Sequence, residues 1–179
     1  MRLKAMAKIN LGLDVLGKRE DGYHEVRMIM QTIRMYDILD IRKTRRPGIV
    51  LTTNLPFIPT DQRNLVYKAA QMLMEEFDVE EGLSIKLRKF IPVAAGMAGG
   101  SSDAAAAFVG VNRMFHLGLT EEQLMERAVK VGADVPYCIM RGTALAEGIG
   151  EKLTRLPEVP KCYVLIGKPG INVSTKTAY

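Results

Sequence analysis

The chain has 179 residues, with 25 lysines and arginines against 20 aspartates and glutamates, so its formal net charge is +5. Its composition, 47% hydrophobic and 25% charged, is that of a globular protein and excludes a disordered tail. No apolar run reaches the roughly 18 to 20 residues that a membrane-spanning helix needs. At about 100 to 200 residues per domain, the length predicts one domain, or one domain and the beginning of another.

Cysteine usage and the N-terminal sequence bear on the cell compartment. Cys138 and Cys162 lack the spacing of a metal cluster or a redox pair, and charges interrupt the first 15 residues before a signal-peptide core could form. We therefore expect a cytoplasmic protein, with both cysteines serving as small buried hydrophobes. With two histidines in total, a zinc site is not expected.

The basic charge raises the alternative of nucleic-acid binding. Four of the five residues from Arg42 to Arg46 are basic, and Pro47-Gly48 follows them. This pattern is typical of a solvated strand end and turn. Aromatic residues make up only 6% of the chain and tryptophan is absent, so the stacking platform of a single-strand-binding protein is missing. A basic RNA-binding α+β module remains a minor alternative, which predicts affinity that falls steeply with salt.

The first half of the chain predicts mostly sheet. Leu3 to Leu16 forms a strand that leads into a hairpin at Asp21-Gly22, and Val26 to Arg42 supplies one or two more strands. Ile49 to Thr53 and Leu83 to Lys89 also have strand patterns, the latter with apolar residues at alternate positions. Between these two strands, apolar residues at helical spacing predict a helix over residues 64–77, with Asp61 and Asn64 as possible caps.

The second half mixes helices and strands. One helix is expected from about Ser101 to Phe115, and another begins at Thr120, where Thr120 and Gln123 form a capping box. Strand-like segments follow at 137–147 and 162–167, and prolines at 157 and 160 bracket a loop between them. Sheet and helices in mixed order predict an α+β fold rather than a doubly wound βαβ repeat.

The segment from Pro92 to Asp103 joins a predicted strand to an alanine-rich helix through three glycines and two serines. Small residues let the backbone approach a ligand closely, and the free amides at the start of a helix favour phosphate. The sequence fits neither the Walker P-loop nor the dinucleotide fingerprint. Taken alone, the segment leaves two interpretations open: a phosphate cradle, or a simple N-cap at Ser101 or Ser102.

Two further positions are candidates for chemistry. Asp134 stands between small residues at the predicted end of a helix, where Pro136 limits continuation, and it could be only a turn former. Lys8 and Asn10 interrupt an apolar strand, and a lone lysine in a strand usually points to solvent. Neither position identifies a site by itself.

Together, these segments resemble the GHMP kinase superfamily, whose members share an early strand with a functional lysine, a glycine-rich phosphate loop opening a helix, and a later aspartate. Within it, AKINLGLDVLGKREDGYHE (7–25), IPVAAGMAGGSSDAAAA (91–107), GADVPY (132–137) and AEGIGE (146–151) are similar to the kinases of the non-mevalonate isoprenoid pathway that act on a cytidine-diphosphate-linked methylerythritol. The resemblance implies the α+β fold of the N-terminal GHMP kinase domain, which is like the second domain of ribosomal protein S5. It also implies a mixed sheet with helices packed on one side.

The resemblance implies ATP-dependent phosphorylation of the substrate's 2-hydroxyl, with Mg²⁺ bridging the ATP phosphates. Asp134 would take the hydroxyl proton, and Lys8 beside it would favour the ionised carboxylate and stabilise the reacting oxygen. Ser102 is a candidate neighbour of the metal. The residues expected to bind the ATP phosphates are Pro92, Ala94, Ala95, Gly96, Met97, Ala98, Gly99, Gly100, Ser101 and Ser102.

Substrate selection is implied at Asn10, Tyr23, His24, Asp134 and Tyr179. An aromatic ring stacks on the cytosine and tolerates any base, so a hydrogen-bonding histidine has to supply discrimination. Tyr179 stands where a second aromatic would close the cytosine sandwich. Without the resemblance, Tyr23 and His24 would be interpreted as residues that flank a turn.

Members of this family are longer than this chain and carry a second domain. We therefore expect residues 1–155 to form the N-terminal, ATP-binding domain and residues 156–179 to begin a C-terminal domain that is otherwise absent. The surface left by the missing domain could cause self-association. A non-catalytic nucleotide- or phosphate-binding fragment is the main alternative to a kinase. Neither nucleic acid nor a membrane is expected as a partner.

Overall fold

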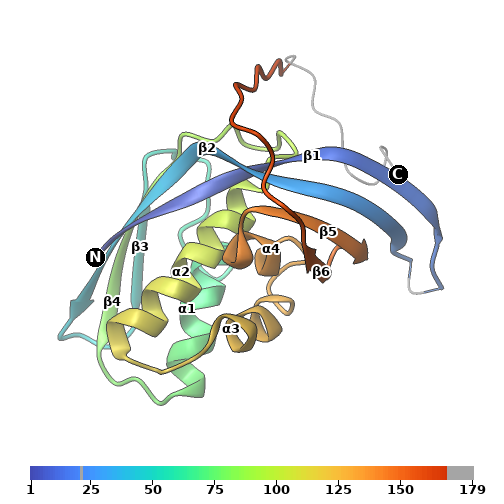
Figure 1. Cartoon of the computed structure of the whole chain (residues 1–179). Helices are drawn as coiled ribbons and strands as arrows, with labels where there is room; N and C mark the ends of the chain where they lie inside the picture. Colours follow the sequence, from blue (N-terminus) through green and yellow to red (C-terminus); the bar gives the residue numbers. More distant parts are fainter. Residues whose placement is uncertain (21, 169–179) are drawn as a thin grey trace.

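The computed structural model describes residues 1–20 and 22–168. Strands and helices alternate in a mixed order along the chain (Figure 1). In chain order the elements are β1 (Arg2–Lys18), β2 (His24–Thr44), β3 (Ile49–Thr53), α1 (Leu65–Glu76), β4 (Gly82–Arg88), α2 (Gly99–Phe115), α3 (Glu121–Ala128), α4 (Val135–Met140), β5 (Thr143–Gly148) and β6 (Lys152–Arg155).

The strands form one mixed sheet with the order β3-β4-β2-β5-β6, and β1 pairs separately with β2. Only β3 and β4 pair in parallel; the other pairings between the described strands are antiparallel. The helices lie together on one side of the curved sheet (Figure 1). This arrangement confirms the predicted α+β class, the mixed sheet and the placement of the helices.

The core lies between the sheet and α2. In β4, Leu83, Ile85 and Leu87 are buried at alternate positions, as the period of two requires. In α2, residues 104–107 are alanines and all are buried, so this helix can approach the sheet closely. A Cβ atom at Gly110 would stand 2.5 Å from the Ile41 Cδ1 atom, so a side chain there would have to displace Ile41. These small residues fix the distance between α2 and the sheet.

Two helix starts follow the predicted capping chemistry. The Asn64 side chain accepts a hydrogen bond from the Val66 amide at 2.9 Å at the start of α1. At α3, Thr120 and Gln123 form the reciprocal bonds of a capping box. The predicted strand at residues 49–53 coincides with β3.

The prediction of a strand over residues 137–147 is wrong in its first part. Residues 135–140 form α4, which has a proline in its first turn, and β5 begins only at Thr143. All six residues of α4 are buried, and an uninterrupted apolar run of this length does not distinguish a buried helix from a buried strand. Asp134 consequently precedes a helix and does not end one.

The chain after β5 also differs from the prediction. β6 was not anticipated, and the strand predicted at 162–167 does not form in the described part of the chain. Tyr163 and Leu165 are fully exposed there, and no neighbouring strand supplies a ladder of hydrogen bonds. Cys138 is buried as expected, whereas Cys162 is exposed, so its predicted burial is wrong. The division into domains at residue 155 stays a prediction.

No helix in residues 1–20 and 22–168 is long and apolar enough to cross a membrane.

Candidate active site

The glycine-rich loop 92–98 connects β4 to α2 and has an unusual backbone. Ala94, Gly96 and Ala98 have φ angles of 54°, 68° and 53°, which lie in the left-handed region. Alanine rarely adopts this conformation, so the loop stores strain at two positions. Left-handed residues that alternate with ordinary ones are typical of backbone nests, in which successive N–H groups face an anion.

The loop opens directly into α2. Ala98 is the N-cap residue, and its side chain cannot satisfy the first amides of the helix. Those amides and the positive end of a 17-residue helix therefore face the loop and favour a phosphate. The alternative of a simple N-cap at Ser101 or Ser102 is wrong, because both residues lie inside the helix.

Ser102 makes a hydrogen bond within the fold. It is buried, and its hydroxyl donates to the Met6 carbonyl of β1 at 2.6 Å. This bond ties the first turn of α2 to the edge strand. The geometry therefore gives no support to Ser102 as a neighbour of a metal ion.

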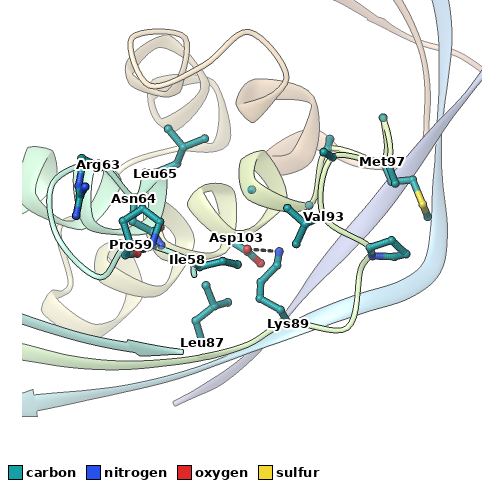
Figure 2. Close-up of a pocket in the computed structure, with 17 residues that line it drawn as sticks. Ile58, Pro59, Arg63, Asn64, Leu65, Leu87, Lys89, Val93, Met97 and Asp103 are labelled. Carbon is teal, nitrogen blue, oxygen red and sulfur yellow. Dashed lines mark hydrogen bonds and ion pairs between the residues drawn. The ribbon is translucent and has the colours of Figure 1, made fainter. Parts of the chain in front are cut away.

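A pocket of about 370 Å³ lies beside the loop. One wall is the loop and the start of α2, and the other is formed by the segment before α1 and its first residue (Figure 2). Lys89 and Asp103 point toward each other between these walls, near Ile58 and Val93 (Figure 2). The pocket thus continues from the phosphate loop into a partly apolar cavity. Its remaining lining includes Pro59, Arg63, Asn64, Leu65, Leu87 and Met97.

A buried ionic cluster forms the base of this region. The Lys89 ammonium donates to one carboxylate oxygen each of Asp37 and Asp103, at 2.6 Å to the latter. At most 8% of the surface of any of the three residues is exposed. Sequence reasoning missed this cluster because its members come from β2, the end of β4 and α2. The only signal in the sequence was a pair of charged residues, Lys89 and Asp103, on either side of a loop without other charges.

Asp103 is the least satisfied member of the cluster. Its Oδ1 atom is buried and has no hydrogen-bond partner among the described residues. Burial raises the pKa of the Asp103 carboxyl well above its usual range, against the attraction of Lys89 and with a smaller contribution from Asp37. The neutral form of this carboxyl is therefore favoured more than in an exposed aspartate.

A second lysine lies on the other side of the loop. Lys8 is 5% exposed, its Nζ donates to the Asn10 Oδ1 atom at 3.0 Å, and it lies 3.7 Å from the Asp134 carboxylate. The Lys8 amide donates to the Met97 carbonyl of the loop at 3.1 Å. The structure therefore brings Lys8, Asn10 and Asp134 together next to the loop.

A bulge explains why Lys8 does not point to solvent. The register of β1 against β2 shifts between Met6 and Lys8, and again between Asn10 and Gly12. Ala7 and Lys8 are consecutive and both buried, which regular alternation would forbid. The interpretation of Lys8 as a solvent-facing residue of a strand is therefore wrong.

Asp134 occupies the N-cap position of α4, and its side chain makes no capping bond. That side chain is 32% exposed, so the carboxylate is accessible while one side faces Lys8. Behind it, burial and then the charge of Asp134 raise the pKa of the Cys138 thiol, which stays protonated. Asp134 thus presents an accessible carboxylate at this corner.

The remaining predicted site residues lie elsewhere. Tyr23 and His24 are at the closed end of the β1–β2 hairpin, where the Arg19 amide donates to the Tyr23 carbonyl at 2.8 Å and His24 pairs with Lys18. Tyr23 is 59% exposed. Tyr179 lies outside the described residues.

Comparison with known proteins agrees with this geometry. Residues 64–142 match the family described as GHMP kinases N terminal domain. The chain is 58% identical over its whole length to a 4-diphosphocytidyl-2-C-methyl-D-erythritol kinase of Lachnospira eligens and 58% identical over 177 residues to the enzyme of the same name from Lachnoclostridium phytofermentans. It spans 62% and 61% of the length of these two proteins.

A solved structure shows the same fold. The crystal structure of a 4-(cytidine 5'-diphospho)-2C-methyl-D-erythritol kinase superposes on 87% of this chain and 55% of its own, with a TM-score of 0.76 and 35% sequence identity. The glycine-rich loop, the α+β architecture and these similarities lead to one conclusion: the chain has the α+β fold of the GHMP kinase N-terminal domain.

Proposed function

We propose that this chain carries the phosphoryl-transfer site of a kinase that uses ATP to phosphorylate the 2-hydroxyl of 4-diphosphocytidyl-2-C-methyl-D-erythritol, in non-mevalonate isoprenoid biosynthesis. The observation that carries the proposal is the junction between Lys8 and the loop. The Lys8 ammonium lies next to the Asp134 carboxylate, and the Lys8 backbone amide donates to the Met97 carbonyl. The acid–base pair and the phosphate loop are therefore fixed relative to each other.

Asp134 is the proposed base. Its accessible carboxylate, 3.7 Å from the Lys8 ammonium, accepts the proton of the attacking hydroxyl. Lys8 also supplies positive charge at the oxygen that attacks the γ-phosphoryl group. Phosphoryl transfer needs little covalent help, so positioning and charge neutralisation by these residues lower most of the barrier.

The loop and the start of α2 are the proposed phosphate site. The backbone amides around Gly96 and Gly99 supply donors without side-chain bulk, and the partly apolar pocket next to them accommodates the nucleoside.

Mg²⁺ is proposed to bind through the phosphates. The described residues contain no group of three or more His, Cys, Asp or Glu side chains suited to a metal ion. This fits an ion that keeps several waters and is held mainly by phosphate oxygens. When bound, Mg²⁺ would neutralise charge on the β- and γ-phosphates.

Substrate recognition is proposed at Asn10, Tyr23, His24 and Tyr179. Tyr23 presents an exposed ring suited to stacking on a cytosine, and His24 beside it can discriminate the base edge. Asn10 lies next to Lys8, where the methylerythritol hydroxyls would have to reach Asp134.

Calorimetric titration of the folded chain tests the proposal. We expect binding of 4-diphosphocytidyl-2-C-methyl-D-erythritol, with no binding of mevalonate or homoserine. Phosphorus NMR of a mixture with ATP and Mg²⁺ should then show a new phosphate monoester. Binding of neither ATP nor the cytidine substrate would contradict the proposal, and ATP binding alone would favour a non-catalytic nucleotide binder.

Self-association is a further proposal. Leu11 and Leu16 on β1 are each more than half exposed. Apolar side chains on an exposed surface favour contact between copies. Sedimentation velocity over a range of concentrations should show a rise in mean mass, and a constant monomer mass would rule it out.

A further inference from the structure

The buried cluster of Asp37, Lys89 and Asp103 contacts both ends of the phosphate loop. At the entry, the Asp37 Oδ1 atom accepts hydrogen bonds from the amides of Phe90 and Ile91, at 2.5 and 2.8 Å. These are the last two residues before Pro92. At the exit, Lys89 bonds Asp103 in the second turn of α2.

Gly99, the first residue of α2, packs directly on this cluster. A Cβ atom at Gly99 would stand 3.2 Å from the Lys89 Nζ atom and 3.2 Å from the Ile91 Cγ2 atom. The start of the helix therefore rests on the ammonium group and on the residue that enters the loop. The two ends of the loop are held against each other through one charged group.

Such a cluster is not an efficient way to stabilise a fold. Desolvation of buried ions offsets most of their attraction, and well-packed apolar residues often give equal or greater stability. What a buried, directional cluster can provide is a single geometry. Here the geometry that it fixes is that of a loop with left-handed residues at positions 94, 96 and 98.

We propose that Asp37, Lys89 and Asp103 form a positioning cluster that holds the two ends of loop 92–98 in the arrangement that binds ATP phosphates. The inference rests on the proposed function. Asp37 is the informative member, because it is fully buried and does not line the pocket. It can influence a nucleotide only through the loop backbone and through Lys89.

The experiment compares two affinities in the same variant. Asp37→Asn keeps an oxygen that can accept from the Phe90 and Ile91 amides but removes the charge that faces Lys89. We expect the dissociation constant for ATP to rise at least about tenfold, since sub-ångström misplacement of binding groups is costly. The dissociation constant for the cytidine substrate should stay within about twofold. A loss of overall stability alone would not separate the affinity for ATP from the affinity for the cytidine substrate.

Asp40→Asn is the matched control. It lies three residues along β2, and its carboxylate pairs with Arg2 and Arg88 outside the pocket. This variant should leave both dissociation constants unchanged. If Asp37→Asn does not fold, as judged by circular dichroism, Asp103→Asn serves as the second variant, since it retains the shape of the side chain.

The outcomes separate the two proposals. If the unaltered chain binds no ATP, the proposed function fails and this inference fails with it. If the unaltered chain binds ATP and a folded Asp37→Asn or Asp103→Asn variant binds it equally well, only the inference is overturned. Failure of both variants to fold, or an equal loss of affinity for both ligands, would also overturn it, because the cluster would then serve stability alone.

Discussion

The chain contains two buried lysines that face carboxylates on either side of one loop, and they differ in how closely they bond these carboxylates and in how far the carboxylates are buried. Lys89 bonds two buried carboxylates directly, whereas Lys8 lies 3.7 Å from a carboxylate that is one-third exposed. The first arrangement holds the ammonium between two buried carboxylates. The second leaves a charged oxygen accessible beside a fixed cation, which is what a proton acceptor in a reaction requires.

The difference shows that the burial of the carboxylate partners gives two similar lysines different roles. A buried ammonium shared by two carboxylates has no freedom to move, so it can define the position of a backbone. A looser pair beside solvent can exchange a proton and rearrange around a ligand. Substitutions that affect catalysis should therefore separate cleanly from those that affect stability or loop geometry.

The largest expected effect is on chemistry at the open pair. Asp134→Asn should lower the rate of phosphoryl transfer at saturating substrate by about 10²- to 10⁴-fold, because the amide cannot accept the hydroxyl proton. Affinity for both ligands should change little. A single-turnover assay measures the rate, and calorimetry measures the affinities for the two ligands. Asp14→Asn, on an exposed part of β1, is the control. A variant that keeps its rate would remove Asp134 from the mechanism.

The next effect is on stability at the closed pair. Lys89→Met should lower the free energy of unfolding by about 3 to 5 kcal/mol, since two buried carboxylates lose their counter-ion. Lys8→Met should cost about 1 kcal/mol or less, because Asp134 and Asn10 can turn to water. Urea denaturation of both variants gives the comparison. Equal losses would show that the burial of the carboxylate partners does not distinguish the two lysines.

A pH series sharpens the comparison at Asp103. Its folded-state pKa is raised by burial, so the folded chain binds a proton more tightly there than the unfolded chain does. The stabilising contribution is therefore complete below the ordinary pKa of an aspartate and is lost as pH rises through the raised value. Relative to Asp103→Asn, the unaltered chain should lose stability as the pH rises from about 4 through this raised pKa. Parallel stability curves for the two proteins would contradict this.

The smallest effect concerns two neighbouring glycines. Gly100→Ala should raise stability by about 0.5 to 1 kcal/mol, because its Cβ would meet only the Leu65 Cδ1 atom, at 3.8 Å, and alanine favours a helix. Gly99→Ala should lose that gain, since its Cβ would press on Lys89 and Ile91. Thermal melts compare the two variants directly. Identical shifts in melting temperature would show that Lys89 and Ile91 move aside easily for a methyl group at position 99.

Regular elements were predictable where periodicity and caps agree. The period of two in β4 and the cap chemistry of α1 and α3 are local, so the sequence alone defines them. The helix α4 was not recognised, because its short run of buried residues carries no period. The exposed segment at 162–167 has the composition of a strand but pairs with no strand in the described part of the chain.

The candidate site was predictable as a set of residues but not as a geometry. Resemblance selected Lys8, Asp134 and the loop, and the structure brings them together. The burial of Lys8 depends on a bulge that only strand pairing reveals. In the buried cluster, Lys89 bonds Asp37, which is 52 positions away in the sequence, and Asp103, which is 14 positions away. No local sequence pattern connects these three residues. The roles assigned to Lys8, Asp134 and the loop remain predictions.

The central position of β2 has a consequence for how the chain is made. Gln31 in β2 and Thr143 in β5 lie on paired strands and are joined by a hydrogen bond, although 112 residues separate them. At about 5 to 20 residues per second, a ribosome needs roughly 5 to 25 seconds to deliver the second strand after the first. Throughout that interval one edge of β2 offers unpaired amides and carbonyls to any neighbouring chain. Nascent copies on crowded ribosomes should therefore depend on chaperones that cover this edge until β5 emerges.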